Sequence, residues 1–367
     1  VFAMGGAEKR GGMKHFCSSK YWGVWMCFFF IACESEPQST SRVWEFDSSI
    51  RALEVTANHG VWWAGANGLV GSSLDYGTTW RIDTLHLKDG TLPAFRSIAV
   101  TNQAAFVLSI ASPAVLFRRG LNDQAWDSVY VNSDENIFFD SMAFWDDQEG
   151  IAMGDATEEC LSVITTRDGG KNWNLLDCSS LPSIVVDSAG QKEAAFAASN
   201  GNLVLQGDEV WMVSGGVASR IFYSSDRGHS WDVLDTPIKQ GGAMNGMFSA
   251  ARCSDSETIG MAWGGDWEAM NDNAANKVHT RDGGKSWQLH TPGTGPGYRS
   301  CVQYVPNSAC QGIWAVGILG VSQSWDGGTT WITEADSSYL TVRFDAEGEI
   351  AWLAGRGQLK RMPVIRP

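Results

Sequence analysis

The chain contains 367 residues, 44% of them hydrophobic and 18 of them tryptophan, so it can bury a large core. Its formal net charge is −14, and such an acidic chain lacks the basic surface that nucleic-acid binding requires. No linker or low-complexity run interrupts residues 43–362, which favours a single domain over this range.

The N-terminal 33 residues have a pattern of their own. A basic start at Lys14 precedes an apolar run of about 12 residues, which is too short to span a bilayer comfortably, and the run ends at Cys33. This pattern resembles a bacterial lipoprotein signal with its lipobox. The resemblance implies a signal at 1–33 with cleavage before Cys33, a lipid on Cys33, and a tether at 34–42. Two alternatives stay open: an ordinary secretory signal cut elsewhere, and a true start downstream of residues 1–12.

An octet of the form S/T-x-D-x-G-x-(T/S/N)-W recurs along the rest of the chain. Its five copies lie at 73–80, 166–173, 224–231, 280–287 and 324–331. The Asp can accept hydrogen bonds from the amides that follow it, and the Gly permits a positive φ. The Trp carries a large apolar surface into the next strand. Each octet is therefore predicted to be a β-hairpin tip, and a degenerate copy at 120–126 keeps only Trp126.

Two short strands rich in apolar residues precede each octet, and the octet turn joins a third strand to a fourth. Each repeat therefore predicts one four-stranded antiparallel blade. The predicted first strands include 51–56, 96–100, 141–144, 247–250 and 301–305. The predicted second strands include 61–64, 150–153, 209–213, 259–263 and 312–316.

The two ends of the chain predict how the ring closes. Three strands at 340–345, 350–354 and 358–362 have no octet after them, whereas Val43–Phe46 is a lone strand with nothing before it. We expect Val43–Phe46 to complete the last blade, which would leave few free sheet edges. The sequence thus predicts an all-β, seven-bladed β-propeller over 43–367. The alternatives are a ring of six or eight blades and an open array of hairpins.

Five cysteines remain downstream of Cys33. Cys160 and Cys178 are predicted to lie in loops on one face of the ring and to form a disulfide. Cys301 and Cys310 could also pair, and buried free thiols are the alternative to both bonds. None of the spacings is typical of a zinc site.

The octets resemble the Asp-box, or BNR repeat, and the copy at 280–287 looks most like those of the photosystem II stability/assembly factor family. The resemblance covers 43–362 and implies that the octets lie at the blade periphery, away from the ligand. No octet residue is therefore a candidate site residue. The F/Y-R-I-P motif of sialidases is absent, and its nearest match is Phe95-Arg-Ser-Ile98.

Aligning the repeats places Arg51, Arg96 and Arg299 at the first position of the channel-lining strand. We expect these arginines to cluster on one arc of the channel mouth and to bind a carboxylate, a phosphate or an acidic peptide. The alternative is a structural role, in which the arginines pair with channel carboxylates such as Asp140 or Glu54.

The longest predicted loop on the same face covers 264–273. Within it, Trp267 is flanked by Asp266 and Glu268 and could stack a sugar or anchor a peptide. The acidic residues of the loop match no calcium-binding spacing. A solvated acidic loop is the alternative.

These features predict a non-catalytic binding or assembly scaffold of the bacterial envelope that holds a protein or peptide over its channel face. It is expected to be monomeric, to carry no cofactor, catalytic residue or metal, and to contact the membrane through its lipid alone. The second hypothesis is a carbohydrate-active enzyme or glycan-binding propeller, of sialidase-like or glycoside hydrolase-like type. Two carboxylates facing the channel would favour that enzyme.

Overall fold

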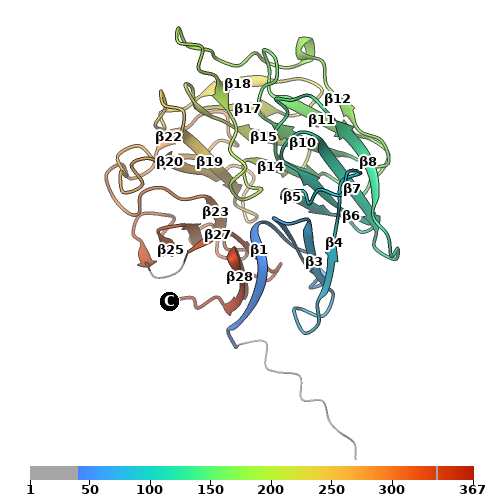
Figure 1. Cartoon of the computed structure of the whole chain (residues 1–367). Coiled ribbons are helices and arrows are strands. Elements are labelled where there is room, and N and C mark those ends of the chain that lie inside the picture. Colours follow the sequence, from blue (N-terminus) through green and yellow to red (C-terminus); the bar gives the residue numbers. More distant parts are fainter. Residues whose placement is uncertain (1–39, 336–337) are drawn as a thin grey trace, which may run out of the picture. The chain divides into compact units, whose positions relative to one another are not determined.

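The computed structural model describes residues 40–335 and 338–367, which fold mainly into β-sheets (Figure 1). The predicted signal, Cys33 and most of the tether lie outside these residues. No helix in the described ranges combines the length and apolar character needed to cross a bilayer.

The strands form six antiparallel sheets. Two sheets have six strands: β27 (Tyr339–Phe344), β28 (Ile350–Pro363), β1 (Arg42–Val55), β2 (Val61–Gly65), β3 (Leu69–Ser73) and β4 (Arg81–Thr84); and β13 (Glu193–Ala194), β16 (Gly215–Gly216), β19 (Asn245–Arg252), β20 (Gly260–Asp266), β21 (Lys277–Thr280) and β22 (Gln288–Leu289).

The other four sheets have four strands each. They are β5 (Phe95–Val100), β6 (Ala104–Ser109), β7 (Ala114–Gly120) and β8 (Asp127–Asn132); β9 (Phe139–Phe144), β10 (Gly150–Gly154), β11 (Ser162–Thr166) and β12 (Asn174–Leu175); β14 (Leu203–Gln206), β15 (Glu209–Val213), β17 (Arg220–Ser224) and β18 (Asp232–Asp235); and β23 (Cys301–Tyr304), β24 (Ile313–Gly317), β25 (Gly320–Ser324) and β26 (Ile332–Glu334). A short 3-10 helix, η1, covers Cys178–Ser180.

The prediction of seven four-stranded blades is wrong, because the described residues form a propeller of six sheets. The two ends of the chain do pair as expected, with Trp44 opposite Leu359. However, β1 continues without a break from this pairing into its pairing with β2, where Val55 lies opposite Val61. The strands expected to make a separate last blade therefore share one sheet with β2, β3 and β4.

The octets form the hairpin turns that the sequence predicts. They join β3 to β4, β11 to β12, β17 to β18, β21 to β22, and β25 to β26. The degenerate copy joins β7 to β8.

The octet at 280–287 shows how such a turn is fixed. Asp282 Oδ1 accepts hydrogen bonds from Thr280 Oγ1 at 2.7 Å and from the Ser286 amide at 2.9 Å. The Gly284 amide donates to Thr280 Oγ1 at 2.9 Å, and Gly284 has a φ of +92°. Although burial acts to raise the pKa of Asp282, hydrogen bonds led by that of the Ser286 hydroxyl lower it to about 2. The turn therefore keeps a charged acceptor at neutral pH.

The octet glycines also bring neighbouring sheets into contact. A Cβ at Gly284 would lie 2.6 Å from the ring of Trp211 in β15, and one at Gly170 would lie 2.1 Å from Phe106 in β6. Each aromatic residue belongs to the second strand of the preceding sheet. The turn that ends one sheet is thus packed against the core of its neighbour, where only glycine fits.

Two disulfides lie in the described residues. Cys160 and Cys178 are bonded, which confirms the predicted pair. Cys310 is bonded to Cys253, whereas Cys301 is a buried free thiol, so the Cys301–Cys310 alternative is wrong.

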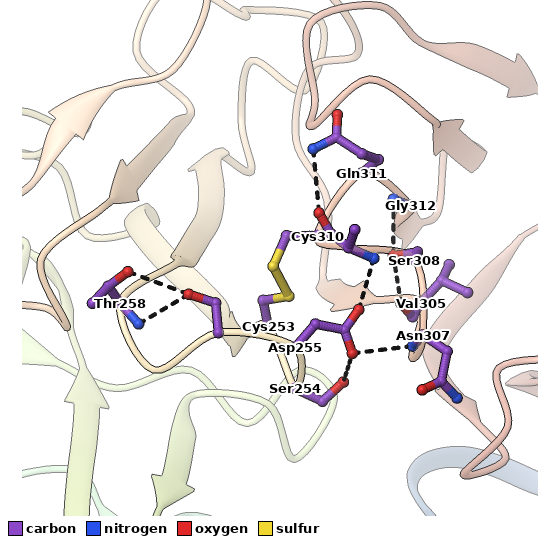
Figure 2. The surroundings of a disulfide bond; sticks show 12 residues. Cys253, Ser254, Asp255, Thr258, Val305, Asn307, Ser308, Cys310, Gln311 and Gly312 are labelled. Carbon is purple, nitrogen blue, oxygen red and sulfur yellow. Dashed lines mark hydrogen bonds between the residues drawn. A yellow bond between two sulfur atoms is a disulfide. The ribbon is translucent and has the colours of Figure 1, made fainter.

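Figure 2 shows that the second disulfide joins the loop after β19 to the loop between β23 and β24. Next to it, the Asp255 carboxylate accepts hydrogen bonds from the amides of Asn307 at 3.3 Å and Ala309 at 2.7 Å. Two neighbouring sheets are therefore linked covalently and by hydrogen bonds at the same place.

We expect Trp44→Ala to lower the free energy of unfolding by about 3 kcal/mol, because it removes a large ring from the contact between the chain ends. Trp44 stacks on Trp352 at 5.4 Å and meets Trp80 edge-on at 5.7 Å. The matched control is Val43→Ala, which alters a neighbouring side chain that is 49% exposed and should change stability by less than about 0.5 kcal/mol. Urea unfolding followed by circular dichroism measures both, and equal effects would contradict a role for Trp44 in closure.

Candidate functional site

Two of the predicted arginines, Arg51 of β1 and Arg96 of β5, line one cavity of about 360 Å³. Arg51 lies within β1, where the pairing with β2 begins, and Arg96 is the second residue of β5; β1 and β5 are neighbours. We call this the mouth cavity and define it by its lining residues Arg51, Arg96, Asp155, Phe196, Trp267 and Tyr298. It combines cationic groups with an aromatic wall.

The positive charges of Arg51 and Arg96 in the mouth cavity are incompletely balanced by nearby negative charge. Burial lowers the pKa of Arg51 to about 10, the like charge of Arg96 acts in the same direction, and Arg356 adds a smaller repulsion. Burial also lowers the pKa of Arg96, and Asp140 opposes that shift. Neither Arg51 nor Arg96 forms an ion pair with any residue in the described ranges. Both remain protonated at neutral pH, so the cavity is cationic.

Arg299 does not line this cavity. Its side chain is 2% exposed and donates hydrogen bonds to the Tyr298 carbonyl oxygen at 2.8 Å and to Ser322 Oγ at 2.7 Å. It lies beside Gly317, whose lack of a side chain leaves room for it. The third guanidinium near Arg51 is instead that of the exposed Arg356.

A short segment of the chain itself fills part of the channel. We call residues 195–200, immediately before β14, the resident segment. The Ala197 carbonyl oxygen accepts a hydrogen bond from Arg96 Nη1 at 3.2 Å, and the Ala198 oxygen accepts one from Arg51 Nη1 at 3.5 Å. The cations of the mouth cavity thus face main-chain oxygens of their own chain.

The predicted loop contributes its tryptophan. Trp267 lies edge-on to Tyr298 at 5.2 Å and lines the mouth cavity, whereas Glu268 is exposed. Lys239 Nζ lies 3.1 Å from Asp266 Oδ2 and 2.7 Å from Asp272 Oδ2. The acidic side chains therefore hold the loop in place through a lysine, and Trp267 is the loop residue that the structure brings to the arginines.

The carboxylates near the cavity differ in whether a ligand in the cavity could reach them. Asp155 lines the cavity, and its Oδ1 accepts a hydrogen bond from the Ala195 amide at 2.8 Å. Burial raises its pKa to about 6, against the opposing effects of this hydrogen bond and of Lys192. Asp140 is fully buried, neither of its oxygens has a hydrogen-bond partner among the described residues, and burial raises its pKa well above the ordinary value. A substrate could reach Asp155 but not Asp140.

The ends of β1 and β5 that lie away from Arg51 and Arg96 help to line a second cavity of about 440 Å³. Glu54 and Arg343 carry charges in this cavity near the resident segment. Arg343 donates to the carbonyl oxygens of Ser199 at 3.3 Å and Asn200 at 3.1 Å. Glu54 is thus near Arg343, and no ion pair joins it to Arg51, Arg96 or Arg299 in the described ranges.

Sequence reasoning missed the resident segment, Phe248 and Tyr298. One signal was available, because Trp173 and Trp231 lie 58 residues apart whereas Trp287 and Trp331 lie 44 apart. The excess chain includes residues 195–200.

The sheets and the channel cavity define the protein as a β-propeller. No protein-family model matches the chain, and no curated protein matches it either. Several solved propellers are similar to it in fold. A structure of YCF48 bound to a D1 peptide has a TM-score of 0.59 and 15% identity, covering 89% of this chain and 97% of that one.

Two further solved structures cover the same part of the chain. YCF48 from Cyanidioschyzon merolae has a TM-score of 0.58 and 14% identity, covering 88% of this chain and 98% of that one. The GH74 xyloglucanase from Xanthomonas campestris has a TM-score of 0.59 and 14% identity, covering 87% of this chain and 53% of that one. At such identities the similarity shows the fold alone.

We expect Asp155→Asn to stabilise the protein more at pH 7.5 than at pH 4. The folded-state pKa of about 6 lies above the ordinary value of 3.8, so the folded protein binds more protons between these values and loses stability as pH rises through them. The variant lacks this loss, which amounts to about 2 to 3 kcal/mol at about 1.4 kcal/mol per pKa unit.

Urea unfolding of wild type and variant at the two pH values measures this difference. Asp127→Asn, at an exposed position in β8, corrects for the general effect of removing one carboxylate. A stability gain for Asp155→Asn that does not change with pH would contradict the assignment.

Proposed function

We propose that this protein is a non-catalytic binding or assembly scaffold that holds a protein or peptide partner at the mouth cavity. The observation that carries the proposal is the pair Arg51 and Arg96, two desolvated cations without ion-pair partners in the described ranges, beside the aromatic wall of Trp267 and Tyr298. Guanidinium groups in such a setting suit carboxylates and main-chain oxygens, and aromatic walls suit apolar side chains. A structure of YCF48, a propeller of similar fold, bound to a D1 peptide supports a peptide ligand.

The carbohydrate-active alternative has less support. Hydrolysis of a glycosidic bond ordinarily needs two carboxyl groups that both reach the substrate. Among the described residues that line the mouth cavity, Asp155 is the single carboxylate, since Asp140 is fully buried. The chemistry of the cavity therefore favours binding over hydrolysis.

The same proposal includes the identity of the repeats and the location of the protein. The hydrogen-bonded turn at 280–287 supports an Asp-box propeller resembling the photosystem II stability/assembly factor family. The segment ending at Cys33 supports a lipid anchor in the bacterial envelope, on which the acidic propeller is held as a monomer.

We expect Arg51→Ala combined with Arg96→Ala to reduce recovery of the partner by at least about tenfold, because each hydrogen bond from a charged group contributes about 1.5 to 3 kcal/mol. A crosslinking pulldown from the native envelope, quantified by mass spectrometry, measures the loss. Lys171→Ala combined with Lys285→Ala removes the same charge from exposed octet turns and should leave recovery unchanged. Identical recovery profiles for both double variants would refute the proposed site.

We expect Cys33→Ser to abolish incorporation of a radioactive fatty acid and to release the protein from the membrane fraction, because a thiol is needed to carry the lipid. Metabolic labelling of cells expressing the full chain measures this. Cys27→Ser, a few residues earlier in the same apolar run, should still be labelled. An unlabelled wild-type protein would exclude the anchor and leave the binding proposal intact.

A further inference from the structure

The resident segment forms one wall of the mouth cavity, where it contacts both aromatic residues and arginines. The Phe196 ring stacks on Phe248, with centroids 3.9 Å apart and planes 6° apart. Phe248 in turn meets Tyr298 edge-on at 4.8 Å. The Phe196 ring therefore packs on Phe248, which contacts Tyr298 of the mouth cavity. The carbonyl oxygens of Ala197 and Ala198 face the arginines.

The hydrogen bonds from the arginines to the resident segment are weak. Their two hydrogen bonds measure 3.2 and 3.5 Å, whereas bonds from a guanidinium to a charged acceptor are usually about 2.7 to 2.9 Å long. The Ala198 amide is turned back to the Phe196 carbonyl oxygen at 2.7 Å, so this part of the segment forms a tight local turn. A ligand with a carboxylate, or with better placed carbonyl oxygens, would satisfy the arginines more fully.

The segment is anchored at both ends. At its outer end it follows β13, which pairs with β16, and the Ala195 amide donates to Asp155 Oδ1 at 2.8 Å. Asn200, with a φ of +55°, marks the corner where the chain turns into the channel. Its side chain donates to the Ile98 carbonyl oxygen at 2.9 Å and accepts from the Met142 amide at 3.0 Å. Asn202, just beyond, is hydrogen-bonded to Ser141. Displacing residues 195–198 therefore breaks the Ala195–Asp155 hydrogen bond and the stacking of Phe196 on Phe248, while Asn200 and Asn202 keep β14 in place.

We infer that residues 195–198 occupy the aromatic and arginine contacts that the partner uses, and that the partner is a peptide segment with an aromatic residue followed by small residues. This inference rests on the proposed function and specifies its ligand. The partner places its aromatic ring against Phe248 and Tyr298 and offers oxygens to Arg51 and Arg96. Binding then requires displacement of residues 195–198, so the apparent affinity is the intrinsic affinity multiplied by the fraction of molecules in which these residues have moved away.

The test uses a fluorescent peptide copy of the segment, acetyl-Ala-Phe-Ala-Ala-Ser-Asn-amide, titrated into the intact protein. Phe196→Ala removes the aromatic anchor of the resident segment, and we expect it to bind the peptide at least about tenfold more tightly than wild type. Val186→Ala alters an exposed residue of the same connection and should bind as wild type does. A peptide with Ala in place of Phe should lose the gain.

Hydrogen exchange tests the same displacement in the wild-type protein, without a variant that must fold. Saturating peptide should speed exchange of the amides of Ala195 and Ala198, whereas the amide of Met142, held by Asn200, should stay protected. Equal affinity of wild type and Phe196→Ala, with unchanged exchange, would overturn the inference. Lack of peptide binding by either protein would overturn it too, and the proposed function would still stand if the pulldown depended on Arg51 and Arg96.

Discussion

The pairing of β1 is the interaction on which the remaining structure depends. Its first half is hydrogen-bonded to β28 from the end of the chain, and its second half to β2. The ring is thereby closed by one continuous strand. Because Trp44 and Arg51 lie on this same strand, the aromatic contact that fastens the chain ends also fixes the start of the segment that carries Arg51 into the mouth cavity. The closure of the ring and the position of Arg51 therefore depend on the same strand.

The octets have a structural role that differs from that of the mouth cavity. Gly170 and Gly284 each lie against an aromatic ring of the preceding sheet, and Gly77 lies against Trp44 and Trp352 of its own sheet, so a side chain there would collide with the core. The repeated pattern of the octet is explained by turn formation and by this close packing. The candidate binding residues lie instead at positions where the repeats differ, such as those of Arg51 and Arg96.

The repeat made most of the fold predictable, because its glycines and tryptophans are local signals. The hairpins, the inner strands, the pairing of the ends and the Cys160–Cys178 bond all follow from it. The number of blades did not, since strand continuity in β1 and β28 has no signal in composition. Arg51 and Arg96 could be placed together from the register alone. Arg299 could not, because its direction depends on Gly317 and Ser322 in neighbouring strands.

The resident segment also solves an electrostatic problem of the cavity. Two guanidinium groups that are partly removed from water and repel each other need hydrogen-bond acceptors. Main-chain oxygens of Ala197 and Ala198 supply acceptors without adding a charge. The compensation is incomplete, since carbonyl dipoles do not neutralise a cation. A partner that brings negative charge gains the difference, while the acidic surface elsewhere repels the same partner. Under the proposed function, the protein would select ligands that can place their charge at the mouth cavity.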